Sequence, residues 1–191
     1  MRPSLFFLIL LLMTGCSTSS DESQKRLTEE AVKLTSPASG EAELRRSLGL
    51  LNEAIDLNDE YLPARKQRVR VLVRLGELTE AASEADAVAE LSGSPQDYFF
   101  QCMVREASNP EYSDHQECYI EASRRYECSV EEPATDINYV LALKLANSGR
   151  FERTADQFLD SLTADASREL FKPLLLESDR DQIISDLFYQ P

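Results

Sequence analysis

The chain has 191 residues, with 34 acidic and 20 basic side chains and a net charge of −14 at pH 7. Nucleic acid and anionic lipid both attract concentrated basic surfaces, so this excess of acid argues against binding nucleic acid and against peripheral attachment to anionic lipid. An apolar content of 42% over this length supports one domain or one short array.

The first residues have the pattern of an export signal. Arg2 is followed by the uncharged apolar run 5–13, which is shorter than the roughly 20 residues that a membrane-spanning helix needs. The run leads through Thr14 and Gly15 into Cys16, and residues 12–16 resemble the bacterial lipoprotein signal. That resemblance implies cleavage before Cys16, with diacylglycerol on its sulfur and an acyl chain on the new amino terminus. The alternative is a plain secreted protein with a stray thiol.

The residues after Cys16 predict where the protein lies. Ser17 follows it, not the Asp that retains many such lipoproteins in the inner membrane, so we expect the periplasmic face of the bacterial outer membrane. Residues 1–15 would then be the signal peptide, the Ser-rich stretch 16–24 a lipidated tether, and 25–191 the folded domain. Loss of Arg2 with the signal leaves a net charge of about −15.

A set of apolar residues recurs in the next part of the chain. The set has the spacing of one helical face and returns 34 residues later, so the repeating unit contains a helix. Its members are Leu44, Leu51, Ala54 and Leu57, which recur as Leu78, Ala85, Val88 and Leu91. A second helical pattern precedes the repeat and ends at Gly76, because glycine tolerates the left-handed conformation of many helix C-termini.

The stretch "RLGELTEAASEADAVAELSGSP" resembles a tetratricopeptide repeat, with Gly76 at the turn, Ala81 and Ala85 at close helix contacts and Pro95 at the end. Gly149, Phe151 and Phe158 echo Gly76, Leu78 and Ala85 in a later unit. The resemblance implies an all-α fold, a short tetratricopeptide-like α-solenoid of antiparallel helix pairs. An irregular helical bundle is the alternative.

The repeat divides the chain into units of similar length. The units cover residues 28–61, 62–95, 96–134 and 135–168, and the third contains a long turn at "SNPEYSD". The remaining residues would form a pair of capping helices with Leu174, Leu175, Ile184 and Leu187 packed inward. Pro37 must interrupt the first unit, since proline breaks a helix interior.

Three cysteines remain after Cys16, and an oxidising periplasm allows one disulfide among them. If residues 98–107 and 115–126 form an antiparallel helix pair, Cys102 and Cys118 lie at similar heights along it, so we predict that they are bonded. Cys118 and Cys128 would lie about 15 Å apart on one continuous helix, which is too far for a disulfide.

The sequence contains few features of an enzyme or a metal site. There is a single histidine, His115, which we expect exposed near a helix start, and no Gly-rich phosphate loop, calcium loop or nucleophile motif is found. We therefore predict no catalytic residues, no metal and no cofactor.

In tetratricopeptide proteins the first helix of each pair lines a concave groove that binds a peptide or a partner's helix. By that resemblance, Lys66, Arg70 and Arg74 would form a basic stripe for an acidic partner segment or a C-terminal carboxylate. The alternative is a solvated face balanced by nearby glutamates. Phe100 and Tyr139 would face the same groove, although aromatic residues at helical spacing are also typical of a core.

Two functions fit these features. The first is a non-catalytic, lipid-anchored adaptor or assembly factor that binds one protein of an envelope machine, such as a pilus, secretin or polymer-export complex. The second is an immunity protein that inhibits a toxic effector delivered into the periplasm. A regular basic groove favours an adaptor, whereas small size, strong acidity and degenerate repeats favour an inhibitor.

Overall fold

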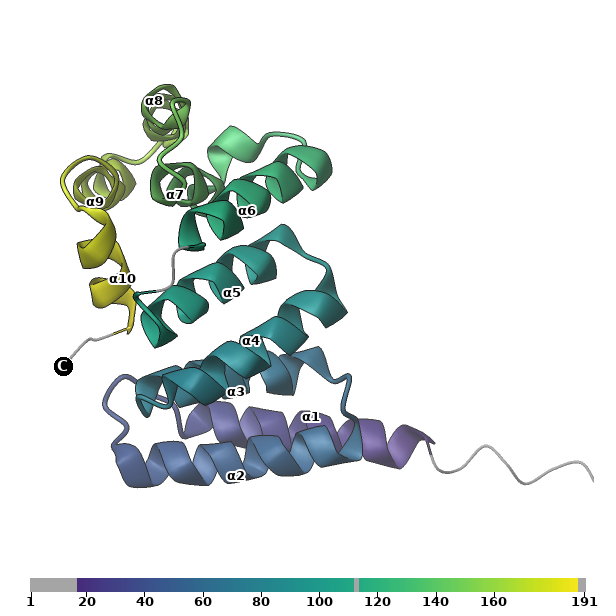
Figure 1. Cartoon of the computed structure of the whole chain (residues 1–191). Helices are drawn as coiled ribbons and strands as arrows, with labels where there is room; N and C mark the ends of the chain where they lie inside the picture. The colour runs from purple at the N-terminus through teal and green to yellow at the C-terminus, as the bar shows by residue number, and fades with distance from the viewer. Residues whose placement is uncertain (1–16, 112–113, 189–191) are drawn as a thin grey trace, which may run out of the picture.

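The computed structural model describes residues 17–111 and 114–188, and within these ranges every regular element is helical. Four consecutive pairs, α1/α2 to α7/α8, are followed by α9 and α10 (Figure 1). The helices are α1 (Ser17–Lys33), α2 (Glu41–Leu57), α3 (Leu62–Arg74), α4 (Leu78–Ser92), α5 (Pro95–Ser108), α6 (His115–Ser129), η1 (Pro133–Thr135), α7 (Ile137–Leu145), α8 (Phe151–Ser161), α9 (Asp165–Leu176) and α10 (Arg180–Phe188).

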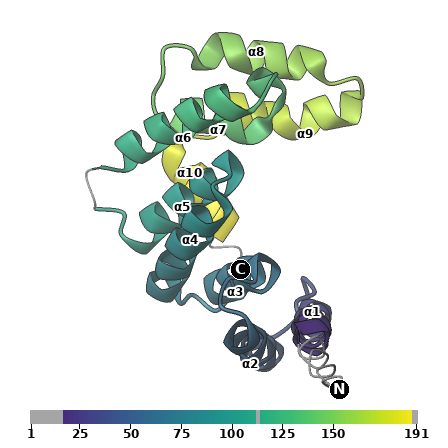
Figure 2. The same cartoon turned by 90° about the vertical axis from the view of Figure 1, so that its right-hand side faces the viewer.

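Each helix from α1 to α8 packs against the next helix in the chain, and α1 also contacts α3 while α5 contacts α7. The first helices of the pairs therefore share one side of the array, which we call the first-helix face (α1, α3, α5 and α7). The direction of the helix axes changes along the array. Helices α1 to α3 are seen side-on in Figure 1 and end-on in Figure 2, whereas α8 and α9 are seen end-on in Figure 1 and side-on in Figure 2. The predicted all-α array is confirmed.

Helix α1 includes residues that the sequence analysis assigned to a tether. Its first residue is Ser17, and Gln24, Thr28 and Ala31 are buried on one side of it. These positions follow the helical spacing that places side chains on one face, and α1 packs along α2. Residues 17–24 are thus helical, and the polar composition of the segment concealed this helix.

The repeated apolar positions mostly form the core, with two exceptions. Leu44, Leu51 and Ala54 are buried, as are Ala85 and Val88, and Leu78 packs at the edge of the core. Leu57 and Leu91, however, are 46% and 40% exposed. Each lies in the last turn of its helix, where the chain leaves the contact with the neighbouring helix.

In two of the helix pairs, a residue with a left-handed backbone conformation follows the end of the first helix. Gly76 has a φ of 74°, and the next amide, of Glu77, donates to the Leu72 carbonyl at 2.9 Å. In the fourth unit the equivalent residue is Asn147, with a φ of 51°, and not Gly149. Asparagine reaches this conformation more easily than most residues because its short polar side chain is accommodated there. Because the left-handed residue is Asn147, four positions before α8, the turn before α8 is two residues longer than the turn before α4.

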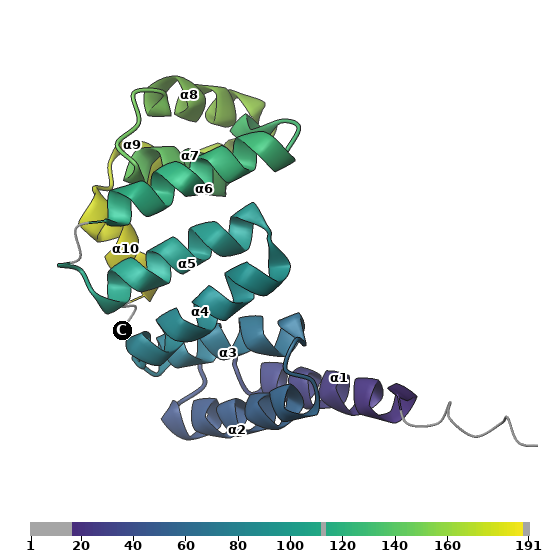
Figure 3. The same cartoon turned by 45° about the vertical axis from the view of Figure 1, so that its right-hand side comes forward.

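The last two helices do not simply cap the array. α9 packs on α8, but α10 returns to α5, near the middle of the chain (Figure 3). Leu175 and Ile184 are buried and Leu174 packs at the core edge, as predicted, whereas the side chain of Leu187 lies outside the described part. Ile183, fully buried, was not predicted.

A disulfide joins Cys102 of α5 to Cys118 of α6, with Cα atoms 5.7 Å apart. The predicted pairing is confirmed, because the two helices run antiparallel and place both residues at the same height. Cys128, farther along α6, is free and exposed.

Candidate partner-binding groove

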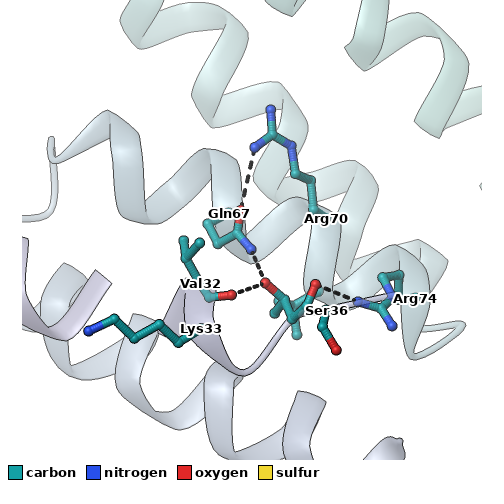
Figure 4. A pocket seen from close by; sticks show the side chains of 8 residues that line it. Val32, Lys33, Ser36, Gln67, Arg70 and Arg74 are labelled. Carbon is teal, nitrogen blue, oxygen red and sulfur yellow. Dashed lines mark hydrogen bonds between the residues drawn. The ribbon is translucent and has the colours of Figure 1, made fainter. Parts of the chain in front are cut away.

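Two cavities lie along the first-helix face, and Arg70 lines both. The first, about 340 Å³, lies between the end of α1 and α3 (Figure 4), and the second, about 190 Å³, lies between α3 and α5. We call the two together the α1–α5 groove. Its lining residues are Val32, Lys33, Thr35, Ser36, Gln67, Arg70, Val71 and Arg74 in the first cavity, and Lys66, Val69, Arg70, Val88, Gln96, Asp97 and Phe100 in the second.

Lys66, the first residue of the predicted stripe, is paired within the protein. Its Nζ lies 2.6 Å from Oδ2 of Asp97, in the first turn of α5. Burial alone would raise the pKa of Asp97, but hydrogen bonds from Lys66, Ser92 and Ser94 lower that pKa below its ordinary value. Lys66 therefore joins the second and third units, and its charge is already matched.

Arg74, the last residue of the stripe, is also engaged. Its Nη1 donates to the Thr35 carbonyl at 3.1 Å and its Nη2 donates to the Ser39 carbonyl at 3.3 Å. Both carbonyls belong to the connection between α1 and α2, so Arg74 holds that connection against the end of α3. Its positive charge is not neutralised, because carbonyl groups carry no net charge.

Arg70 is the residue of the stripe with the least internal bonding. It is exposed, and its Nη1 makes one long hydrogen bond, 3.4 Å, to Oε1 of Gln67. Within the described ranges no carboxylate lies within ion-pair distance of Arg70. Figure 4 shows Arg70 and Arg74 extending in different directions from α3, while Lys33 extends away from both.

The other two basic residues of α3, Arg65 and Arg68, form ion pairs with a buried glutamate of α4. Arg65 and Arg68 donate to the two carboxylate oxygens of Glu84 at 2.8 and 3.1 Å, and the Glu84 side chain is only 8% exposed. Glu84 thus neutralises these arginines between α3 and α4. Glu84 is a glutamate near the predicted stripe, yet it pairs with Arg65 and Arg68 and not with the stripe residues.

The two predicted aromatic residues have different surroundings. Phe100 is half-buried at the edge of the groove, and its ring stacks on Phe188 of α10 at 6.2 Å between centroids. Tyr139 is only 5% exposed, packs on Tyr126, and donates its hydroxyl to Glu127 at 2.9 Å. Burial and this bond raise the pKa of Tyr139 to about 12. Placing Tyr139 in the groove was wrong, because its ring belongs to the core between α6 and α7.

His115 begins α6, as predicted, but it is buried and not exposed. Its Nε2 lies 2.8 Å from the Asn109 carbonyl, so the ring fastens the long α5–α6 connection. Within residues 17–111 and 114–188, no group of three or more His, Cys, Asp or Glu side chains could hold a metal ion.

The described helices include none that is both long enough and apolar enough to cross a membrane. Cys16 and the predicted signal sequence lie outside the described residues.

Three groove residues, Val32, Thr35 and Gln67, were not expected from the sequence. Val32 is apolar yet 49% exposed, and nothing in the sequence distinguished it from Leu27 and Ala31, which pack on the core. Gln67 donates to Oγ1 of Thr35 at 2.9 Å, which ties α3 to the end of α1. Comparison of the chain with protein-family models, with curated proteins and with solved structures finds no match.

Proposed function

We propose that this is a non-catalytic, lipid-anchored protein of the bacterial envelope that binds a partner protein through the α1–α5 groove. One observation carries the proposal: the part of the groove between α1 and α3 is lined by Lys33, Arg70 and Arg74 and by no carboxylate. In a chain with a net charge of −14, such a local reversal of sign is suited to a partner of negative charge.

The structure of the array supports binding in preference to chemistry. Repeated helix pairs build long, continuous surfaces, and such surfaces are well suited to holding an extended segment or a helix. The buried ionic groups of this chain, such as Glu84 and Glu106, are bonded to arginines that connect helices. Glu84 and Glu106 therefore stabilise the array by joining its helices.

The proposed anchor would hold the array close to the membrane. Because α1 begins at Ser17, a lipid on Cys16 would be attached directly to the first turn of a helix, without a flexible linker. The proposed location is the periplasmic face of the outer membrane, where the partner would belong to an envelope assembly.

Affinity purification of the full, lipidated chain from its native envelope tests the proposal. We expect one protein to co-purify in near-stoichiometric amount and to be released by salt, since charge attraction is screened over about 8 to 10 Å at physiological ionic strength. Failure to recover any stoichiometric partner, with or without mild cross-linking, would contradict the proposal.

The partner's identity would also decide the alternative. The strongly acidic surface is the observation that favours an immunity protein, because a basic toxic effector would be attracted to it. A co-purifying lipase or peptidoglycan hydrolase would support inhibition, and a component of a secretion, pilus or export machine would support an adaptor.

A further inference from the structure

The α1–α5 groove combines a cation with apolar surface on both sides. In the first cavity the accessible apolar group is Val32 of α1, 49% exposed, and in the second it is half-buried Phe100 of α5. The valines that also line the cavities, Val69, Val71 and Val88, are at most 3% exposed and form the floor. Arg70 stands between these two apolar areas because it lines both cavities. A ligand that fills the groove therefore meets apolar, positive and again apolar surface in sequence.

Of the three residues of the predicted stripe, Arg70 can bind an external carboxylate with the least loss of internal bonding. Lys66 would have to leave Asp97, and Arg74 would have to leave the carbonyls of Thr35 and Ser39. Arg70 would exchange only a long bond to Gln67. The planar guanidinium also presents two parallel donors to a carboxylate, which strengthens the bond and fixes its orientation.

α10 determines where the groove ends. Phe188 stacks on Phe100 at the boundary of the second cavity, and Arg180 pairs with Glu106 farther along α5. Ile183, Ile184 and Phe188 are all buried in the main core, so a ligand that displaced α10 would expose them to water. α10 therefore remains in place, and the face beyond Phe100 is closed to a partner.

We infer that the α1–α5 groove takes a short acidic segment of the partner, in which one carboxylate flanked by apolar side chains binds Arg70, and that α10 ends the site at Phe100. This inference rests on the proposed function and specifies its ligand. The carboxylate pairs with the Arg70 guanidinium. One apolar side chain lies against Val32, and another lies against Phe100.

Photo-cross-linking in the native envelope tests the position of the segment. A photoreactive phenylalanine analogue replaces Val32 in one version of the full chain and Leu91 in another; the two positions are 49% and 40% exposed. We expect an adduct with the co-purifying partner from position 32 and none from position 91. An adduct from position 91 alone would place the partner on the opposite ends of the helices and overturn the inference.

Charge variants of the full chain test the chemistry. Arg70→Gln should reduce the recovered partner about fivefold or more, since truncating one member of a desolvated charge pair mainly speeds dissociation. Arg70→Lys, which keeps the charge but loses the planar fork, should have a smaller effect. Arg153→Gln, which removes the same charge from an exposed position on α8, should have none. Circular dichroism should show unchanged folding for all three variants.

The partner's cross-linked peptide then identifies the carboxylate. Changing its Asp or Glu to the amide should cause the same loss as Arg70→Gln, and combining the two changes should add little, because paired residues are not additive. Wild-type recovery of the partner by Arg70→Gln would refute the inference and leave the proposed function standing. Absence of any partner from the wild-type protein would refute both.

Discussion

Arg180 in α10 holds Glu106 in α5 through two hydrogen bonds, 2.6 Å from Nε to Oε1 and 3.0 Å from Nη2 to Oε2, although the residues lie 74 positions apart. Glu106 also accepts the Tyr119 hydroxyl at 2.7 Å, and Arg180 donates to the Leu145 carbonyl at 2.6 Å. One buried carboxylate therefore connects α5, α6 and α10. Burial and the Glu106 charge raise the pKa of Tyr119 far above its ordinary value, so the phenol remains a hydrogen-bond donor.

Arg180→Met should destabilise the protein by about 2 to 4 kcal/mol, because it leaves Glu106 buried without its cation. Since Arg180 is itself 35% exposed, we expect the lower part of that range. Urea unfolding followed by circular dichroism measures the change. Arg153→Met, which removes an exposed arginine from α8, serves as the control and should alter stability by less than about 0.5 kcal/mol. Equal unfolding midpoints for the two variants would show that the Arg180 clamp contributes little.

Removing the disulfide should weaken the third unit. Cys102 and Cys118 are separated by 16 residues, and closing a loop of about this length stabilises a fold by about 3 kcal/mol. The double variant Cys102→Ala, Cys118→Ala should lose stability of that order in thermal unfolding. Cys128→Ala should have no comparable effect, because Cys128 is exposed and free. Peptide mapping without reductant should recover the 102–118 cross-link, and a 118–128 cross-link would contradict the assignment.

The close contact between α3 and α4 depends on small residues. Ala81 and Ala85 are 0% and 2% exposed, so Ala85→Leu should overpack the contact at a cost of about 1 to 3 kcal/mol. Ala42→Leu, an identical change at an exposed position of α2, is the control for side-chain size. Calorimetric melting temperatures report both, and a larger loss for Ala42→Leu would be inconsistent with this packing.

The Lys66–Asp97 pair should make stability depend on pH. The pKa of Asp97 is lowered in the folded protein, so its stabilising contribution is present above the ordinary value near 3.8 and is lost as the pH falls through the lowered value. Asp97→Asn should cost about 1 to 2 kcal/mol at pH 7, and the difference from wild type should narrow in acid. Asp156→Asn, at an exposed site in α8, controls for general charge effects. A difference that stayed constant from pH 7 to strongly acidic solution would mean that Asp97 acts through packing alone.

Cys16→Ala should release the protein from the membrane fraction into the soluble fraction. The reason is that several acyl chains bind a bilayer far more firmly than any surface of this acidic chain, at about 0.8 kcal/mol per buried CH2 group. Fractionation followed by immunoblotting measures the change, and Cys128→Ala is the matched control. If the Cys16 variant still sediments with membranes as wild type does, the lipid anchor is wrong.

Periodicity in the sequence was sufficient to predict the helices, because the pattern of apolar residues along a helix is local. The recurrence of Leu51 at Ala85 located two equivalent helices, and the antiparallel pairing of consecutive helices placed Cys102 beside Cys118. The same local reasoning missed the helix over residues 17–24. The buried residues at and just after this stretch, Gln24 and Thr28, are polar, and polar residues give no apolar periodicity.

The tertiary structure decided which cations are available and how long the groove is. Lys66, Arg70 and Arg74 are equivalent by spacing, yet Asp97 neutralises the first and the carbonyls of Thr35 and Ser39 engage the last. Those partners lie 31 to 39 positions away, and electrostatic pairing across helices depends on how the helices pack, which no local pattern reports. The packing of α10 on α5 joins residues that are still farther apart in the sequence, since Arg180 pairs with a buried glutamate 74 residues earlier in the chain.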